Sequence, residues 1–154
     1  MKIDAMLGSM YPHQAADLAK RMEDIGFDAV WSFEAGHDPF LPLAVAAMST
    51  EQIHLGTNIA VAFGRSPFAT AQAAWDLQRS SNGRFHLGLG TQVRAHVERR
   101  YDMPFEHPAA RLTDYIRCLH AIFDNFQNGS KPDYQGQFYK FILPNPAFIP
   151  GPID

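Results

Sequence analysis

Two polar residues near the N-terminal third of the chain could perform proton transfer. Glu34 and His37 lie in the segment Glu-Ala-Gly-His, directly after the apolar run 27–33. A carboxylate and an imidazole can exchange protons with a substrate, because an imidazole changes charge near neutral pH. The alternative is structural: Glu34 would accept hydrogen bonds from backbone N–H groups, and His37 would lie at the surface. Composition and spacing leave both interpretations open.

The segment after residue 90 has a positive character that suits an anionic ligand. It contains Arg94, His96, Arg99 and Arg100. Arginine binds phosphate oxygens through paired, charge-assisted hydrogen bonds. A solvated charged loop is the more common explanation of such a cluster. We therefore keep Arg94 as a candidate cofactor contact beside that alternative.

Two further motifs fail as signatures of a known site. Gly88-Leu-Gly90 begins like a dinucleotide-binding fingerprint, but Val93 stands where the third glycine is required. His96-Val-Glu98 has the spacing of zinc deaminases, but the matching Cys-x-x-Cys is absent. The single cysteine, Cys118, falls within a helical pattern and is expected to be a buried structural thiol. No metal site is predicted.

Composition favours one globular domain, residues 1–154. The 154 residues are 46% apolar and 19% charged, and the net charge is −3. The Lys and Arg residues are scattered, so neither nucleic acid nor an anionic membrane is expected as a partner. No apolar run has the length of a membrane span or a signal peptide. We therefore expect a cytoplasmic protein.

The elements that must position these side chains alternate along the chain. Strands are predicted at 3–7, 27–33, 53–60 and 84–89, helices at 12–25, 40–48, 67–81 and 108–127, a loop at 92–106, and a hairpin or a single edge strand at 134–141. Such alternation predicts an α/β fold with a parallel sheet and right-handed crossovers. Four of these units make half of a (β/α)₈ barrel or a small open sheet.

The ends of the predicted strands are the expected place for chemistry. In parallel α/β folds, sites lie at the carboxyl ends of the strands. Glu34 follows the second strand, and Thr91-Gln92 follows the fourth. Gly88 and Gly90, in and after that strand, would let another group approach the backbone closely.

Two stretches of sequence resemble a known family. They are Leu55-Gly-Thr-Asn-Ile-Ala-Val-Ala-Phe-Gly-Arg-Ser-Pro-Phe and Ala71-Gln-Ala-Ala-Trp-Asp-Leu-Gln-Arg-Ser-Ser-Asn-Gly-Arg-Phe-His-Leu-Gly-Leu-Gly-Thr-Gln. Together they resemble the luciferase-like monooxygenase superfamily, most closely its branch that uses the deazaflavin coenzyme F420. The similarity runs from Lys2 to Pro152. It implies a TIM barrel of the (β/α)₈ type, of which this chain supplies about the first four β/α units and a small β element, as the N-terminal half.

The resemblance also implies roles for individual residues. Glu34 matches an acidic residue near the cofactor ring, and Asn58-Ile59 matches a non-prolyl cis peptide that backs the ring. Thr91 matches a residue beside the ring, followed by Gln92. The implied reaction is hydride transfer between F420 and a small organic substrate.

Two departures from the family pattern bear on the chemistry. Relatives that oxidise alcohols carry a histidine directly after the acidic residue, where this chain has Ala35, so that His37 is the nearest imidazole. Val93 stands where those relatives carry an acid. We keep Glu34 and His37 as the candidate catalytic pair for an unspecified substrate.

Two alternatives to the F420 enzyme stay open. The first is an FMN-dependent monooxygenase of the same superfamily, because the flavin and deazaflavin rings share a shape. The second is a non-catalytic partial barrel that dimerises or binds a partner, since family chains are roughly twice as long. A half-barrel would leave sheet edges and an apolar face uncovered, which predicts a homo-oligomer.

Overall fold

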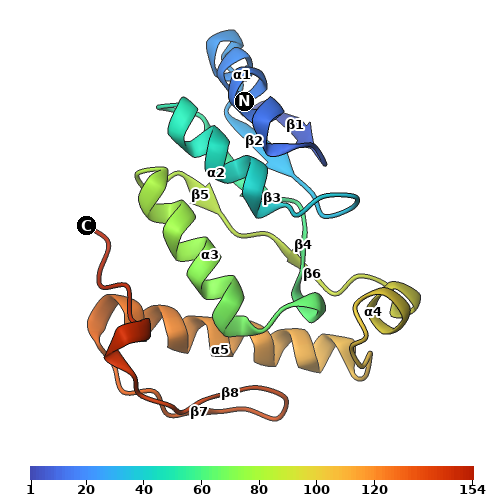
Figure 1. The fold of residues 1–154 in the computed structure, drawn as a ribbon, viewed down its shortest axis with the longest axis vertical. Helices are drawn as coiled ribbons and strands as arrows, with labels where there is room; N and C mark the ends of the chain where they lie inside the picture. The colour runs from blue at the N-terminus through green and yellow to red at the C-terminus, as the bar shows by residue number, and fades with distance from the viewer. The chain divides into compact units, whose positions relative to one another are not determined.

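The computed structural model describes residues 1–154, which form two compact units (Figure 1). The first unit comprises residues 1–61 and 73–90, and the second comprises residues 62–72 and 91–154. Each unit is described here by itself. The single domain expected from the composition stays a prediction. No helix in the chain combines the length and the apolarity needed to cross a membrane.

The first unit contains the predicted alternation of strands and helices. Its elements are β1 (Asp4–Gly8), α1 (Pro12–Ile25), β2 (Ala29–Ser32), α2 (Phe40–Ser49), β3 (His54–Thr57), β4 (Ala60–Val61), the later part of α3 (Pro67–Ser80), β5 (Phe85–His86) and β6 (Leu89–Gly90). Strands β1, β2, β3 and β5 pair in that order, all parallel, and β4 pairs with β6, also parallel. The α/β class and the parallel sheet are therefore confirmed.

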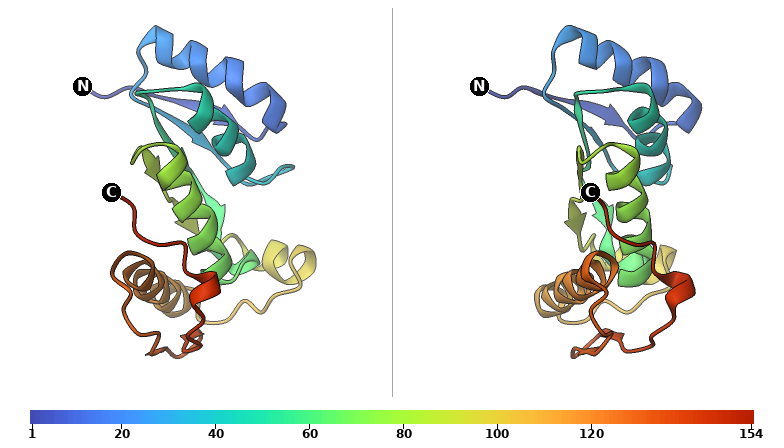
Figure 2. Two further views of the ribbon diagram at one scale, coloured as in Figure 1. Left: turned by 60° about the vertical axis from the view of Figure 1, so that its left-hand side comes forward. Right: turned by 90° about the vertical axis from the view of Figure 1, so that its left-hand side faces the viewer.

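The sheet of the first unit has one covered and one more open face. Leu7, Val30 and Leu55 are almost completely buried, and helices α1 and α2 lie beside these strands (Figure 2). Met6 pairs in register with Trp31 on the alternate face, and 49% of Met6 is exposed. Alternation of this kind places one side chain in two against the helices. The covered face is the core of the unit.

The third and fourth predicted strands are each interrupted, so the prediction of two continuous strands is wrong. Each divides into two short strands, β3 with β4 and β5 with β6. The physical reason is a side chain that enters the ladder. The Thr57 hydroxyl accepts a hydrogen bond from the Gly88 N–H at 2.9 Å and lies 2.7 Å from the Gly88 carbonyl oxygen, to which it donates. Backbone pairing resumes when the Ala60 N–H donates to the Gly88 carbonyl oxygen at 2.9 Å.

Capping residues mark the helix boundaries in both units. Helix α1 ends at Gly26, whose φ of 99° is the left-handed conformation that glycine tolerates. Asp38 Oδ1 accepts the backbone N–H of Phe40 at 2.8 Å and so caps α2. Ser66 Oγ accepts the N–H of Ala69 at 3.1 Å at the start of α3. The predicted helix ranges 12–25, 40–48 and 67–81 therefore agree with α1, α2 and α3 to within one residue at each end.

The second unit is built around one long helix. Its elements are the short helical turn η1 (Ala62–Gly64), the beginning of α3, α4 (Arg94–Arg100), α5 (Pro108–Asn128), the antiparallel pair β7 (Tyr134–Gln135) and β8 (Lys140–Phe141), and the turn η2 (Pro146–Phe148). Residues 134–141 therefore form the hairpin rather than a single edge strand. On α5, Tyr115, Leu119, Ile122 and Phe126 are buried, as their spacing predicts.

The structure corrects the loop predicted at 92–106, because that segment contains helix α4. Only Val97 of this helix is buried. The guanidinium of Arg94 forms an ion pair with Glu98 at 2.8 Å, one helical turn later. Pairs at this spacing stabilise a short helix by a few tenths of a kcal/mol, roughly 0.2–0.5. Two apolar residues in seven, Ala95 and Val97, give no detectable helical periodicity, which is why the sequence pattern does not indicate the helix.

A buried carboxylate attaches the hairpin to α5. Asp114 accepts the backbone N–H groups of Phe138 at 2.7 Å and Tyr139 at 3.0 Å, and it also bonds the Tyr134 hydroxyl. A Cβ at Gly136 would overlap the Asp114 carboxylate. The glycine of the hairpin therefore makes room for this carboxylate.

The first unit contains a buried arginine that holds three chain segments together. Arg84 is 8% exposed. Its guanidinium donates to the carbonyl oxygens of Ala47, Thr50, Ile53 and Ser81 and to the Thr50 hydroxyl, at 2.7–3.1 Å. These acceptors lie at the end of α2, before β3 and after α3, where carbonyl groups lack helical partners. Arg84 replaces the missing donors.

Arg84→Ala is expected to destabilise the chain by about 3 kcal/mol, because several buried carbonyl groups would lose their donor. Urea denaturation followed by circular dichroism measures the free energy of unfolding. Arg79→Ala is the matched control, since Arg79 is exposed on the last turn of α3. Its effect should stay within about 0.5 kcal/mol. Equal effects of the two variants would contradict the role assigned to Arg84.

A second charged contact in this unit depends on pH. Glu23 Oε1 accepts the backbone N–H groups of Glu51, Gln52 and Ile53, at 2.6–3.0 Å. Partial burial opposes ionisation, but these N–H groups and the ammonium of Lys20 outweigh it and lower the pKa of Glu23 to about 2. The carboxylate thus fixes the turn that leads into β3.

We expect this contact to stabilise the folded chain at neutral pH and to be lost in acid. Because the folded pKa lies below the ordinary 4.5, the contribution is complete above pH 4.5 and disappears as the pH falls to about 2. We expect about 2 kcal/mol after allowance for solvent screening. Unfolding of wild type and Glu23→Gln, measured between pH 2 and 7, should converge at the acid end. A constant difference across that range would refute the assignment.

Candidate active site

Glu34 connects the end of β2 to the segment between β3 and β4. Its backbone N–H donates to the Ile59 carbonyl oxygen at 3.1 Å, and its Oε2 accepts the Val61 N–H at 2.7 Å. The side chain is half-buried. Both contacts belong to the first unit. The structure therefore shows the Glu34 carboxylate accepting a hydrogen bond from a backbone donor, as the structural interpretation expects.

The predicted cis peptide lies inside the segment that Glu34 holds. The bond between Asn58 and Ile59 is cis and involves no proline. The Asn58 N–H donates to the Ser32 carbonyl oxygen at 2.7 Å. Together with the bond from the Glu34 N–H to the Ile59 carbonyl oxygen, this gives a backbone hydrogen bond on each side of the cis bond. The side chain of Asn58 is exposed and that of Ile59 is half-buried. Their contact with a cofactor stays a prediction.

His37 has different neighbours from Glu34. Its backbone N–H donates to Ser9 Oγ at 3.2 Å, and its ring centroid lies 4.4 Å from that of Tyr11. Ser9 and Tyr11 follow β1, whereas the contacts of Glu34 described above are at β4. The structure brings Glu34 together with the cis peptide and places His37 beside Tyr11. The joint catalytic role of Glu34 and His37 stays a prediction.

The space beside Gly88 and Gly90 is occupied by the neighbouring strand. A Cβ on Gly88 would overlap the Thr57 carbonyl oxygen, and one on Gly90 would lie 2.9 Å from the side chain of Ile59. The close approach expected at both glycines is thus confirmed, and the approaching groups are protein atoms. Gly90 also fixes how near β6 lies to the segment that includes the cis peptide.

Thr91 and Gln92 begin the second unit, directly after Gly90. The Thr91 hydroxyl donates to the Gln92 carbonyl oxygen at 3.0 Å, and Gln92 Oε1 accepts the Val93 N–H at 3.0 Å. Gln92 has a φ of 60°, in the left-handed region that few residues other than glycine adopt. Both side chains are half-buried. Their predicted cofactor contacts stay predictions.

Arg94 already has partners on its own helix and in the following loop. Besides the ion pair with Glu98, its guanidinium lies 5.2 Å from the centroid of the Phe105 ring. An anionic ligand would compete with Glu98 for this charge. No group of three or more His, Cys, Asp or Glu side chains has a geometry that could hold a metal ion.

The structure contains a histidine pair that the sequence did not indicate. His54 Nδ1 and His86 Nε2 lie 3.0 Å apart. Partial burial, followed by the charges of His54 and Lys2, lowers the pKa of His86. The two residues are 32 positions apart, and only the register between β3 and β5 brings them together. The pair could have been predicted only if the register between β3 and β5 had been known.

Comparison with known proteins places the chain within one family. Residues 1–154 match the family model described as luciferase-like monooxygenase. An uncharacterized protein of Mycobacterium tuberculosis is 47% identical over 152 residues, which are 99% of this chain and 44% of that protein. An F420-dependent glucose-6-phosphate dehydrogenase of Amycolatopsis mediterranei is 28% identical over 145 residues, covering 85% of this chain and 42% of that enzyme.

Solved structures show the same fold. The coenzyme F420-dependent tetrahydromethanopterin reductase of Methanopyrus kandleri superposes with a TM-score of 0.74 at 22% identity. The match covers 92% of this chain and 46% of the reductase. The fold is therefore of the luciferase-like TIM-barrel type. The chain spans less than half the length of the relatives described here.

Gly88→Ala should destabilise the chain, because the added methyl group would meet the backbone of Thr57. Overpacking of a rigid site costs about 1–3 kcal/mol, and we expect the upper part of that range. Gly36→Ala is the matched control, since a methyl group added there would meet no atom within 4 Å. Thermal melts of both variants test this. A melting temperature of Gly88→Ala as high as that of the control would contradict the close approach.

Proposed function

Because the chain belongs to the luciferase-like monooxygenase family, we propose that it binds coenzyme F420 as part of an oxidoreductase. In that role it transfers a hydride between F420 and a small organic substrate. One observation carries the choice of cofactor: a relative that matches 85% of the chain is named for its dependence on F420. A neighbour in fold is named for the same coenzyme.

The residues at the strand ends suit a flat ring with polar edges. Phe33 is 37% exposed after β2, and Ile59 is half-buried. The exposed amide of Asn58 and the carboxylate of Glu34 supply polar groups beside this apolar surface. Small-molecule sites combine apolar walls with a few placed polar groups in this way. These side chains support the proposal that the ring binds at this strand end.

Glu34 acts in this proposal as a positioning residue. Its carboxylate holds the Val61 N–H and its backbone holds Ile59, so that the segment 58–61 keeps one conformation. F420, when bound, supplies the hydride chemistry. Ile59 would back the ring and exclude water from one face. The cofactor contacts of Thr91, Gln92 and Arg94 stay predictions from the sequence, and His37 is the candidate for proton transfer.

The titration of wild type with F420, followed by the fluorescence of the deazaflavin, tests the cofactor directly. A parallel titration with FMN, followed by absorbance, provides the comparison. We expect saturation by F420 at micromolar concentration and weaker binding of FMN. Tighter binding of FMN would favour the monooxygenase instead. If neither is retained, the proposal fails for this chain and the non-catalytic partial barrel is supported.

Glu34 variants test how the site is held. Glu34→Gln keeps an oxygen that can accept the Val61 N–H, so F420 affinity should stay within about threefold, whereas Glu34→Ala should lose about tenfold, the loss of one hydrogen bond to a charged group. Exposed Glu106→Ala is the matched control and should bind as wild type does. Equal losses in the Gln and Ala variants would show that the charge of Glu34, rather than its bond to Val61, supports cofactor binding, and would contradict the positioning role.

A further inference from the structure

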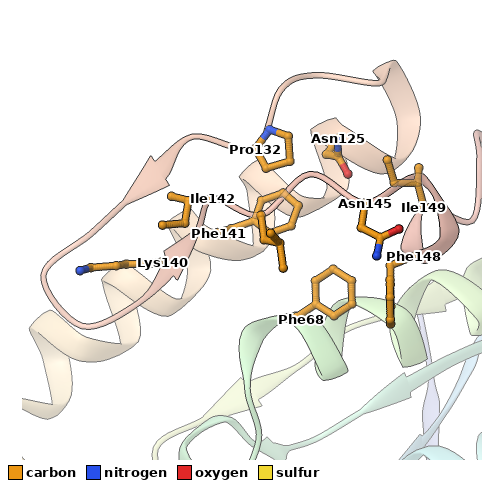
Figure 3. A pocket seen from close by; sticks show the side chains of 10 residues that line it. Phe68, Asn125, Pro132, Lys140, Phe141, Ile142, Asn145, Phe148 and Ile149 are labelled. Carbon is orange, nitrogen blue, oxygen red and sulfur yellow. The ribbon is translucent and has the colours of Figure 1, made fainter.

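The second unit contains a cavity outside the proposed F420 site. Its volume is about 340 Å³, within the roughly 300–1,000 Å³ of small-molecule sites. The lining comes from the start of α3, from α5, and from the segment that includes β8 and η2 (Figure 3). All of these residues belong to one unit.

The walls of this cavity are mainly aromatic and aliphatic. Phe68 contributes one ring, with Phe141 and Phe148 at centroid distances of 5.9 and 6.4 Å from it. Ile142, Leu143 and Phe148 are 51%, 77% and 55% exposed. Large apolar side chains that remain exposed around a hollow are typical of ligand-binding surfaces.

One residue of the lining contains a buried polar atom without a partner. Asn125 is 2% exposed and lines the cavity, and its Oδ1 has no hydrogen-bond partner. Its Nδ2 donates to the Ser130 carbonyl oxygen at 2.5 Å, which fixes the orientation of the amide. A buried acceptor without a donor costs about 1–3 kcal/mol. A ligand with a donor group would remove that cost.

The other polar groups around the cavity provide no charged partner for a ligand inside it. Asn145 Oδ1 already accepts the Ala147 N–H at 3.1 Å. The ammonium of Lys140 points away from the three phenylalanines (Figure 3). The chemistry of the lining is therefore apolar, with one acceptor.

We propose that this cavity binds a neutral aromatic molecule that donates one hydrogen bond to Asn125 Oδ1. The rings of Phe68, Phe141 and Phe148 would pack against its apolar body. None of its lining residues belongs to the proposed cofactor site.

A pair of isosteric probes tests the proposal on the full chain. Indole has an N–H donor, whereas benzofuran has the same shape and no donor. Isothermal calorimetry should show that indole binds wild type about five- to tenfold more tightly than benzofuran, the value of one hydrogen bond. Equal affinities would mean that Asn125 does not recognise the ligand, and no binding of either probe at millimolar concentration would mean that the cavity is not a site. Either result overturns the proposal.

Two variants locate the binding. Asn125→Leu should bring the indole-to-benzofuran ratio close to one, and Ile149→Trp should weaken both probes at least tenfold by filling the cavity. Circular dichroism checks that each variant folds. A selectivity that survives Asn125→Leu, or indole binding unaffected by Ile149→Trp, would place the binding elsewhere and refute the proposal. Should Asn125→Leu not fold, the wild-type probe pair and Ile149→Trp still decide the question.

Discussion

The close approach of Gly88 to Thr57 determines where the parallel pairing in the first unit stops and starts again. With the Thr57 hydroxyl inserted between the strands, the ladder is interrupted at the same level in both. Pairing then restarts as β4 with β6, and the segment between holds the cis bond and the contacts of Glu34. Only glycine allows this approach, since any Cβ would overlap the Thr57 carbonyl group. The geometry of the candidate site therefore depends on a residue that need not contact any ligand.

Much of the fold was predictable because its signals are local. Helix α5 has a sustained apolar face, and the capping residues Asp38, Ser66 and Gly129 each act on neighbours within a few positions. Elements of this kind can be located without knowledge of the partners that they pack against. The interruption of the strands could not be predicted, because it arises from a contact between residues 31 positions apart. Helix α4 gave no comparable signal, since its stability comes from one ion pair and one buried side chain.

The candidate site was likewise predictable in part, and the rest depended on contacts between residues far apart in the sequence. The residues themselves indicated Glu34, the family resemblance indicated the Asn58–Ile59 segment, and the structure brings these together in one unit. The sequence could not show whether Glu34 binds a backbone donor, because that depends on which N–H groups lie within reach of the carboxylate. Val61 provides such a donor. The catalytic role of Glu34 stays a prediction. The amide of Asn125 could not be singled out for a related reason: an asparagine within a helix becomes informative only when its surroundings are known.

The environment of Cys118 has a practical consequence for spectroscopy. It is the single cysteine of the chain, it is 1% exposed, and burial raises the pKa of its thiol to about 11. Since alkylating reagents react with the thiolate, the natural residue is protected from them at neutral pH. Cysteines introduced at the surface can therefore be labelled selectively without removing Cys118.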